Sequence, residues 1–514
     1  MRITNKIMQR NNLSNINTNK IYQDKLSTQM STQKKINKPS DDPVVAIRAL
    51  RLRSSVTEIT QYYSKNIPDA ESWLNVTEDA LKNLSQVMTS MIEQCTRGAN
   101  GDLKNADREI ILEQMKALGE EVYATGDADY AGRYVFTGYR TDTSLSFPSN
   151  KTQTYEITEQ LDRDAIDSMK KVESGNLLDW TSANYSTLTD ADEQAVEVLD
   201  VYRIRLAYND CSEAMTPVIS YKEKAADGTE STVSLDSTLV HSYADPSPYK
   251  QVEKDPSAII YVPETGELLL GKNRYEELMA VKDDVSTVKN EGEIQITYRK
   301  DEWLKGDLRP EHYFYCKSDP GTEEEIEYNA TFLGDTPERQ ILEYDVGFNQ
   351  TIRVNSTADE CFQHGIGREV DDLVSAMQET MDLDNIKTKI EKEMAGADEA
   401  TKAKLQVQLD GAKKALDLSK DKCQKLFEKG ITVFQNYLND ANLSITDCGT
   451  RSKKLELIEN RMQSQKTTFE TLKSENEDVD ITDVAITLNS AELTYEAALM
   501  ATGKVVQTTL LNFI

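Results

Sequence analysis

The sequence has 514 residues, enough for two to four domains with substantial hydrophobic cores. Acidic residues outnumber basic ones 88 to 59, which gives a formal charge of −29. This balance argues against a nucleic-acid-binding protein, because neutralising phosphates requires a basic face. No run of eighteen apolar residues is present, so no membrane-spanning helix is expected.

The six cysteines and three histidines are dispersed along the chain. Even the closest pair of cysteines, Cys423 and Cys448, is too far apart for a CxxC redox motif or a zinc knuckle. We therefore expect free, individually buried thiols. The scattered histidines give no support to a metal site or a histidine-based catalytic triad. No metal, cofactor or catalytic residue is predicted, and we do not expect an enzyme.

Residues 1–40 carry eight basic side chains and one acidic, Asp24. A nucleic-acid-binding tail would fit this charge, but Tyr22 is the only aromatic residue that could stack on a base. The segment is rich in asparagine, a poor helix former. Apolar residues still recur along it, mostly at helical spacing: Ile3, Ile7, Ile16, Leu26 and Met30. We expect an assembly segment that is disordered until it packs on a partner, most obviously the C-terminal segment.

A capping loop follows, with the sequence Asn37-Lys-Pro39-Ser40-Asp41-Asp42-Pro43. Pro39 disfavours helix at the residue before it, while Pro43 suits a first helical turn. Ser40, Asp41 or Asp42 can cap that helix. The two aspartates could instead form a metal or catalytic dyad. Capping is favoured, because adjacent carboxylates on a turn do not converge on one point.

Residues 41–150 are predicted to form the N-terminal part of a helical rod. Apolar heptads run from Val45 to Tyr63, from Leu74 to Cys95 and from Ile111 to Thr125. Pro68 is expected to kink or break the first of these helices. Residues 356–475 are predicted to form the C-terminal part, because Leu455 to Leu472 show the same rhythm. Regular heptads this far apart predict that the two chain ends pack together as one long bundle.

Residues 151–355 have a different sequence pattern. Stretches of alternating apolar and polar residues, or of β-branched residues, occur at 196–204, 258–262, 294–298 and 351–354. Turn dipeptides such as Asp227-Gly228 and Pro320-Gly321 separate them. We predict an inserted β-rich outer module. A stretch rich in Lys, Glu and Ala near 383–424 is predicted to be an extra helical extension with a solvated charged face.

Residues 476–514 are predicted to form a coiled-coil assembly helix. A second apolar stripe accompanies its heptad, so the band is wider than a two-stranded seam needs. Such a band must be buried, by another region of the chain together with copies of itself or a relative. The predicted interface residues are Ile481, Val484, Leu488, Ala491, Tyr495, Ala498, Leu499, Val505, Val506 and Phe513.

Five stretches resemble known sequence motifs: Met1-Arg-Ile-Thr-Asn-Lys-Ile-Met8, the capping loop, Gly132-Arg133-Tyr134-Val-Phe136-Thr-Gly138-Tyr139, Asp447-Cys-Gly449-Thr-Arg451 and Leu493-Thr-Tyr-Glu-Ala-Ala498. With the order of the parts, they resemble the flagellin superfamily and, within it, the flagellar hook-associated protein 3 family. The third stretch is the most specific, since it fits that family's Gly-Arg-Tyr-x-Phe-x-Gly-Tyr turn. Its aromatics could be a platform for stacking a sugar or a base, but packing onto the rod is favoured.

The resemblance implies an α+β fold in which the N- and C-terminal regions form a long antiparallel helical rod with an outer β-rich module. It implies a structural adaptor between the hook-associated layer and the flagellin filament. The implied partners are hook-associated protein 1, flagellin, further copies in a ring and an export chaperone. The implied location is the extracellular flagellum, reached by the flagellar type III route without a cleaved signal peptide. The alternatives are filament flagellin, a cytoplasmic coiled-coil scaffold and a surface-exposed enzyme.

Overall fold

The structure is a computed structural model that describes residues 5–224, 230–280, 294–333 and 340–507. The chain forms two compact units. Unit 1 comprises residues 1–71, 344–352 and 453–514, and unit 2 comprises residues 72–343 and 353–452. Each unit therefore draws on both halves of the sequence, as expected for an α+β chain whose two ends pack together.

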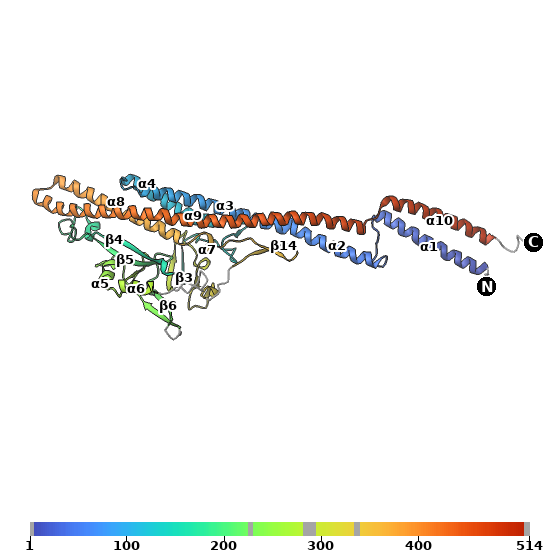
Figure 1. Cartoon of the computed structure of the whole chain (residues 1–514), viewed down its shortest axis with the longest axis horizontal. Coiled ribbons are helices and arrows are strands. Elements are labelled where there is room, and N and C mark those ends of the chain that lie inside the picture. Colours follow the sequence, from blue (N-terminus) through green and yellow to red (C-terminus); the bar gives the residue numbers. More distant parts are fainter. Residues whose placement is uncertain (1–4, 225–229, 281–293, 334–339, 508–514) are drawn as a thin grey trace, which may run out of the picture. The chain divides into compact units, whose positions relative to one another are not determined.

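Unit 1 is mainly helical (Figure 1). Two helices lie near the ends of the chain, α1 (Asn5–Thr32) and α10 (Ile481–Gln507). The others are α2 (Pro43–Gln61), the first residues of α3 (Ile67–Gly98) and the last part of the 79-residue α9 (Glu399–Glu477). A β-hairpin completes the unit, with strands β14 (Glu343–Gly347) and β15 (Gln350–Arg353).

The break expected at Pro68 does not occur. A π-helical turn, Tyr62–Asn66, joins α2 to α3, and Pro68 is the second residue of α3. The N–H of Ile67 bonds to the carbonyl of Tyr62, so this turn is one residue wider than an α-turn. The wider turn accommodates the proline, which has no N–H to donate, without ending the helix.

The β14–β15 hairpin packs on this π-helical turn. Phe348 meets Tyr62 edge to face, with ring centroids 5.7 Å apart. Asn66 Nδ2 donates to the carbonyl oxygen of Asp345 at 2.7 Å, and the Tyr344 hydroxyl donates to the Asp69 carboxylate at 2.6 Å. Residues 344–352, which the sequence groups with the β-rich module, therefore belong to unit 1.

Unit 2 contains two β-sheets. The first has five strands in the order β4-β5-β10-β9-β8, and the second has six in the order β13-β12-β3-β11-β6-β7. The first sheet's strands are β4 (Ile166–Glu173), β5 (Glu197–Arg205), β8 (Thr238–Leu239), β9 (Ile259–Val262) and β10 (Glu267–Leu270). The second sheet's strands are β3 (Lys151–Leu161), β6 (Val218–Lys224), β7 (Glu230–Asp236), β11 (Ile294–Trp303), β12 (Tyr315–Ser318) and β13 (Ile326–Tyr328). Neighbouring strands in these two sheets are antiparallel, except that β8 and β9 are parallel.

The strands predicted at 196–204, 258–262, 294–298 and 351–354 are confirmed as β5, β9, β11 and β15. The turn predicted at Pro320-Gly321 is also present, and Gly321 adopts a φ of +80°. Asp227 lies outside the described residues. Two short helices, α5 (Pro248–Lys254) and α6 (Lys272–Met279), accompany the sheets.

The helical part of unit 2 contains most of α3, α4 (Asn105–Gly126), the short α7 (Ala358–Cys361), α8 (Gly365–Gly396) and the larger part of α9. The heptad predicted on α3 is confirmed, because all its members are buried. These are Leu74, Thr77, Leu81, Leu84, Met88, Met91 and Cys95. All six cysteines are free and buried, as expected. Burial raises the pKa of Cys95 to about 12, so this thiol stays protonated at neutral pH.

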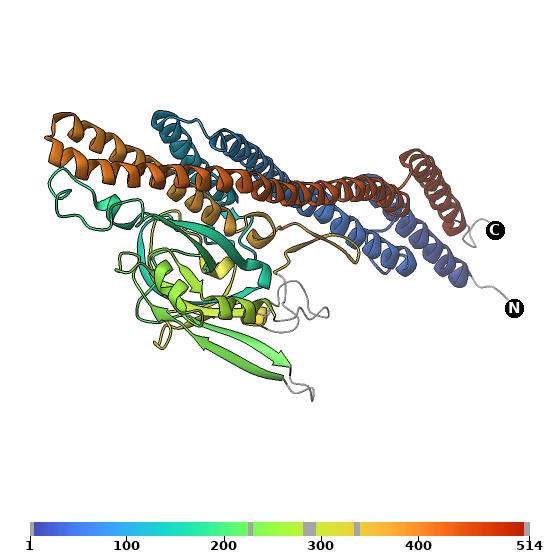
Figure 2. The same cartoon turned by 60° about the vertical axis from the view of Figure 1, so that its left-hand side comes forward.

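The extension near 383–424 consists of two antiparallel helices, the end of α8 and the start of α9 (Figure 2). Its inner face is not solvated. Leu383, Ile390 and Leu405 form a buried core with Trp180, which also donates an indole hydrogen bond to Gln408 at 2.9 Å. The extension therefore holds a segment of the β-rich module.

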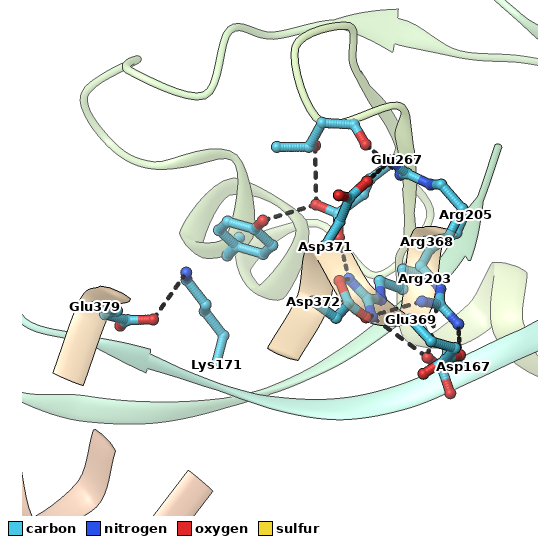
Figure 3. Close-up of polar contacts among 12 residues, drawn as sticks. Asp167, Lys171, Arg203, Arg205, Glu267, Arg368, Glu369, Asp371, Asp372 and Glu379 are labelled. Carbon is cyan, nitrogen blue, oxygen red and sulfur yellow. Dashed lines mark hydrogen bonds and ion pairs between the residues drawn. The ribbon is translucent and has the colours of Figure 1, made fainter. Parts of the chain in front are cut away.

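A buried network of charges joins the five-stranded sheet to α8 (Figure 3). Arg203 on β5, whose side chain is 4% exposed, pairs with Glu267 on β10, Asp167 on β4 and Asp372 on α8. Arg205 also pairs with Asp372, at 2.9 Å. Each buried charge thus has an opposite charge within reach, which a low-dielectric site requires.

No helix among the described residues is long and apolar enough to cross a membrane. Within the same residues, no cluster of three or more histidine, cysteine or carboxylate side chains could hold a metal ion.

Candidate assembly interface

The capping loop positions the start of α2. Asp42 is the N-cap, and its carboxylate accepts hydrogen bonds from the backbone N–H groups of Val44 and Val45 at 3.0 and 3.1 Å. Asp41 accepts from the N–H of Lys38 at 3.0 Å, and this bond lowers the pKa of the Asp41 carboxyl. The two carboxylates point to different donors, which fits the capping interpretation. Pro39 and Ser40 form the turn, and Pro43 is the first helical residue.

The two chain segments that carry α1 and α10 meet in a junction that we call the joint, formed by residues 33–35 and 477–479. The N–H of Lys35 donates to the carbonyl oxygen of Glu477 at 2.7 Å. The N–H of Val479 donates to the carbonyl oxygen of Gln33 at 3.1 Å. The Lys34 ammonium pairs with the Asp478 carboxylate. Backbone bonds and charge together hold the two segments side by side.

Beyond the joint, α1 and α10 lie antiparallel as a helical hairpin, here called the terminal hairpin (Figure 1). Its core is small. Leu26 of α1 is buried with Val484 and Ala491 of α10, and Leu488 packs against them while partly exposed. The heptad positions Tyr495 and Ala498 and, on α1, Ile16 are half-buried. The face of α10 that packs on α1, here called the seam, therefore follows the predicted heptad from Val484 to Ala498.

Several predicted interface residues do not join this seam. Ile481 is 47% exposed, Leu499 45%, Ile7 48% and Met30 40%. The side chains of Val505 and Val506 and the whole of Ile3 and Phe513 lie outside the described residues. Of the second apolar stripe, Leu499 is therefore turned away from α1, because the 3.5-residue repeat brings Val484 and Ala491 to that helix instead.

The seam on α1 is largely polar, since Asn12, Asn19 and Gln23 are the half-buried positions around Ile16 and Leu26. Apolar spacing alone therefore does not find the contacts between α1 and α10, while the assembly interface predicted from Ile7 and Met30 stays a prediction. Residues 5–32 form a helix that packs on α10, and the disorder expected for residues 1–40 before assembly stays a prediction. The expected partner, the C-terminal segment, supplies the packing surface within the same chain.

A further apolar stripe, which was not predicted from the sequence, lies on the opposite side of α10. Its members are Ile486, Leu493 and Met500, which are 64%, 68% and 66% exposed. We call these three residues the outer stripe. The sequence signal that could have identified them is their spacing of seven residues, which places them on one face of the helix. Large apolar side chains that line one exposed helix face are typical of an interaction surface.

The Gly132–Tyr139 stretch packs against helices of unit 2. Strands β1 (Asp129–Tyr130) and β2 (Arg133–Tyr134) form a tight hairpin in which Gly132 adopts a φ of +77°. The Arg133 guanidinium lies 5.0 Å from the ring centroid of Trp73, and the buried Phe136 meets Phe362 edge to face at 4.7 Å. These contacts support the packing interpretation over a stacking platform.

Gly138 has the second positive φ of this stretch, +61°. A Cβ at this position would lie 2.1 Å from Oε1 of Gln340. The same oxygen accepts the N–H of Tyr139 at 2.9 Å. The positive φ favours glycine here, and a side chain would displace the Gln340 amide oxygen that accepts the N–H of Tyr139.

The motif from Asp447 to Arg451 lies on α9. Arg451 Nη1 donates to the carbonyl oxygen of Asn355 at 2.7 Å, and the same guanidinium pairs with Asp447 one turn earlier. Cys448 is buried, with its thiol 3.5 Å from the carbonyl oxygen of Leu74. Gly449 has open space where a side chain would be. Arg451 thus joins α9 to the chain that leaves β15.

Residues 3–141 match the family model described as the bacterial flagellin N-terminal helical region. This part of the chain is similar to the N-terminal helical region of bacterial flagellins. It includes the capping loop and the Gly132–Tyr139 stretch, two of the motifs on which the resemblance rests. The match supports the resemblance to the flagellin superfamily over these residues, and two curated relatives confirm the resemblance to flagellar hook-associated protein 3.

Flagellar hook-associated protein 3 of Salmonella typhimurium is 29% identical over 143 residues, and that of Escherichia coli is 28% identical over 145. Each match covers 28% of this chain and 45% of the relative, so the chain spans about half the length of the curated relatives it matches. A solved putative flagellar hook-associated protein from Vibrio parahaemolyticus is 13% identical, with a TM-score of 0.34; the match covers 85% of this chain and all of that one. That TM-score does not define a common fold.

Proposed function

We propose that this chain is a structural subunit of the bacterial flagellum that assembles through its terminal hairpin. The observation that carries the proposal is the outer stripe, three large apolar side chains that are each about two-thirds exposed on a helix already packed on its other side. A globular enzyme gains nothing from such a surface, whereas a subunit that binds its neighbours buries it. The flagellin-type helical region at residues 3–141 supports this function.

The finer proposal is a junction adaptor between the hook-associated layer and the flagellin filament. Its partners are hook-associated protein 1, flagellin, other copies in a ring and a flagellar export chaperone. It has no catalytic activity, cofactor, nucleic-acid partner or membrane anchor. Export follows the flagellar type III route without a cleaved signal peptide, and the mature location is extracellular. The relatives named flagellar hook-associated protein 3 support this role.

The decisive experiment replaces Leu493 with Asp in bacteria that depend on this chain for their flagella. A carboxylate in the buried interface costs several kcal/mol in each subunit unless it is paired. We expect the variant to be secreted but filaments to be lost, with flagellin released into the medium. Thr494→Asp is the matched control, because it adds the same charge to an exposed neighbouring position off the outer stripe. Normal filaments with Leu493→Asp would contradict assembly through this helix.

Filament flagellin is the second candidate, because the matched family model describes flagellin itself. The two functions differ in copy number and position. Immunogold labelling of intact flagella should mark the base of each filament if the chain is a junction subunit. Labelling along the whole filament would instead identify it as flagellin.

A further inference from the structure

The turn between α3 and α4 contains the one Asn-Gly pair of the sequence, Asn100-Gly101. Asparagine is a chemically labile residue, because the backbone nitrogen of the next residue can attack the carbon of its side-chain amide. A side chain on that next residue hinders the attack and restricts the backbone. Glycine removes both obstacles.

The structure leaves the attacking nitrogen of this pair accessible. Asn100 and Gly101 are both exposed, so water and hydroxide reach them. The N–H of Asn100 donates to the carbonyl oxygen of Arg97 at 3.2 Å, but none of the described residues accepts a hydrogen bond from the N–H of Gly101. The Gly101 nitrogen can therefore lose its proton to hydroxide without breaking a bond within the described part of the chain.

The side chain of Asn100 is turned toward that nitrogen. Its Oδ1 accepts a hydrogen bond from the N–H of Asp102 at 3.3 Å, which closes an Asx turn across the Gly101 peptide. The side-chain amide is thus folded back over the backbone that follows it. The same bond draws electron density away from the amide carbon and makes that carbon a better electrophile.

The two Asn-Ser pairs, which have the next smallest obstacle, are both protected. Asn355 is fully buried; its Oδ1 accepts the N–H of Leu342 at 2.9 Å, and its Nδ2 donates to the carbonyl oxygen of Gln340 at 2.8 Å. Asn489 is exposed, but it lies inside α10, where the N–H of Ser490 belongs to the helical hydrogen-bond ladder. Of the three pairs, only Asn100-Gly101 combines exposure with an available backbone nitrogen.

We propose that Asn100 is a site of spontaneous deamidation, with water as the second reactant. The nitrogen of Gly101 loses its proton and forms a bond to Cγ of Asn100, the bond from Cγ to Nδ2 breaks, and ammonia leaves. Water then opens the resulting succinimide at either of its two carbonyl groups. One opening gives aspartate, and the other gives isoaspartate, whose main chain runs through the former side chain. The inference does not depend on the proposed function.

Both products place a new negative charge where α3, α4 and α9 meet. The charge lies next to Asp102 and at the C-terminal end of α3, where the helix dipole disfavours it. The turn lies beside α9, because a Cβ on Gly101 would lie 3.1 Å from Oε1 of Gln424. Gln424 in turn donates to the Glu428 carboxylate at 2.9 Å. Deamidation therefore adds charge beside an acidic part of α9 and separates older copies of the chain from new ones by charge.

The test follows the folded, full-length chain during incubation in mildly alkaline buffer. Trypsin cuts after Arg97 and Lys104, so the peptide of residues 98–104 carries Asn100 as its single asparagine. We expect mass spectrometry to find the deamidated form of this peptide at least severalfold sooner than deamidation at Asn355 or Asn489. The product should elute as two species that match synthetic peptides with aspartate and isoaspartate. Raising the pH by one unit should speed the reaction severalfold, because hydroxide removes the proton of the attacking nitrogen.

Gly101→Ala provides the control for the route. The added methyl group meets only the end of the exposed Gln424 side chain, so the fold is retained. It should slow deamidation of Asn100 severalfold, because the succinimide forms less easily. An equal rate in this variant would overturn the proposal, since direct hydrolysis of the side chain would then be the route. An unchanged Asn100 in the folded chain, under conditions that convert the free peptide of residues 98–104, would overturn it as well.

Discussion

The Arg53 guanidinium bonds the Glu477 carboxylate through two hydrogen bonds, Nε to Oε1 at 2.6 Å and Nη2 to Oε2 at 2.7 Å. Glu477 is the last residue of α9, and its side chain is only 3% exposed. Its backbone carbonyl also accepts the N–H of Lys35 in the joint. The Arg53–Glu477 pair therefore fixes the point at which the terminal hairpin begins, and it lowers the pKa of the Glu477 carboxyl.

Arg53→Ala should loosen the joint. The change removes both hydrogen bonds that the guanidinium donates to the buried Glu477 carboxylate. We expect a loss of about 1–3 kcal/mol, less than for a fully buried pair, because Arg53 is half exposed. We expect faster amide hydrogen exchange in α1 and α10 and unchanged exchange in the sheets of unit 2. Arg48→Ala is the control, since Arg48 is an exposed arginine on the same helix. Equal exchange in both variants would show that the pair does not hold the joint.

The buried Glu159 makes the stability of unit 2 fall as the pH rises. A carboxylate paired with a cation has the opposite effect, because its folded-state pKa is lowered. Burial raises the pKa of Glu159 to about 7, although the Tyr298 hydroxyl and the N–H of Ala207 donate hydrogen bonds to it. The unfolded chain releases this proton near pH 4.3. Between that pH and about 7 the folded state therefore holds the extra proton, so stability falls as the pH rises and the loss is complete above 7.

Glu159→Gln should remove this dependence. The difference in unfolding free energy between variant and parent should grow by about 3 kcal/mol from pH 5 to pH 8 in favour of the variant. Urea unfolding followed by tryptophan fluorescence measures it, because all three tryptophans (Trp73, Trp180 and Trp303) lie in unit 2. Taking the difference cancels the other titrating groups, including the buried His312 and His364. A difference that does not change with pH would contradict a neutral Glu159.

The heptads were predictable because burial on one helix face repeats every 3.5 residues, whatever lies elsewhere in the chain. This is why every predicted position from Leu74 to Cys95 is buried. The same reasoning does not find the contacts of α1 with α10, where Asn12, Asn19 and Gln23 are half-buried while the apolar Ile7 and Met30 are exposed. A polar seam has no hydrophobic period, so the sequence gives no signal for it.

The charge network on β5 could not be predicted either. Arg203, Glu267 and Asp372 are separated by 64 and more residues and meet only because strand order places β5 beside β10 and against α8. The outer stripe is a different case, because its spacing was visible in the sequence. From the sequence alone, it cannot be told apart from the other apolar positions of this helix. Only the position of α1 shows which side of α10 stays exposed.

Arg203→Ala should destabilise unit 2 strongly. Removing the guanidinium leaves Glu267, Asp167 and Asp372 close together in a buried site, and breaking such a pair costs about 3–5 kcal/mol. The control is Lys170→Ala on the neighbouring strand, whose ion pair with Asp200 spans 4.0 Å and is exposed on both sides. We expect that control to change stability by less than about 1 kcal/mol. Urea unfolding followed by tryptophan fluorescence compares the two, and equal midpoints would mean that the network does not hold the sheet.

Leu26→Ala should open the terminal hairpin without weakening unit 2. Leu26 is one of three buried residues in the hairpin core, and its truncation costs about 2–4 kcal/mol, more than so small a core can lose. We expect brief proteolysis to remove α1 and α10, while tryptophan fluorescence of unit 2 shows the parent's urea midpoint. Leu13→Ala is the matched control, because Leu13 lies on the same helix but is 62% exposed. If Leu26→Ala is cut no faster than Leu13→Ala, the hairpin is not held by this core; if the unit 2 midpoint also falls, the hairpin is not an independent folding unit.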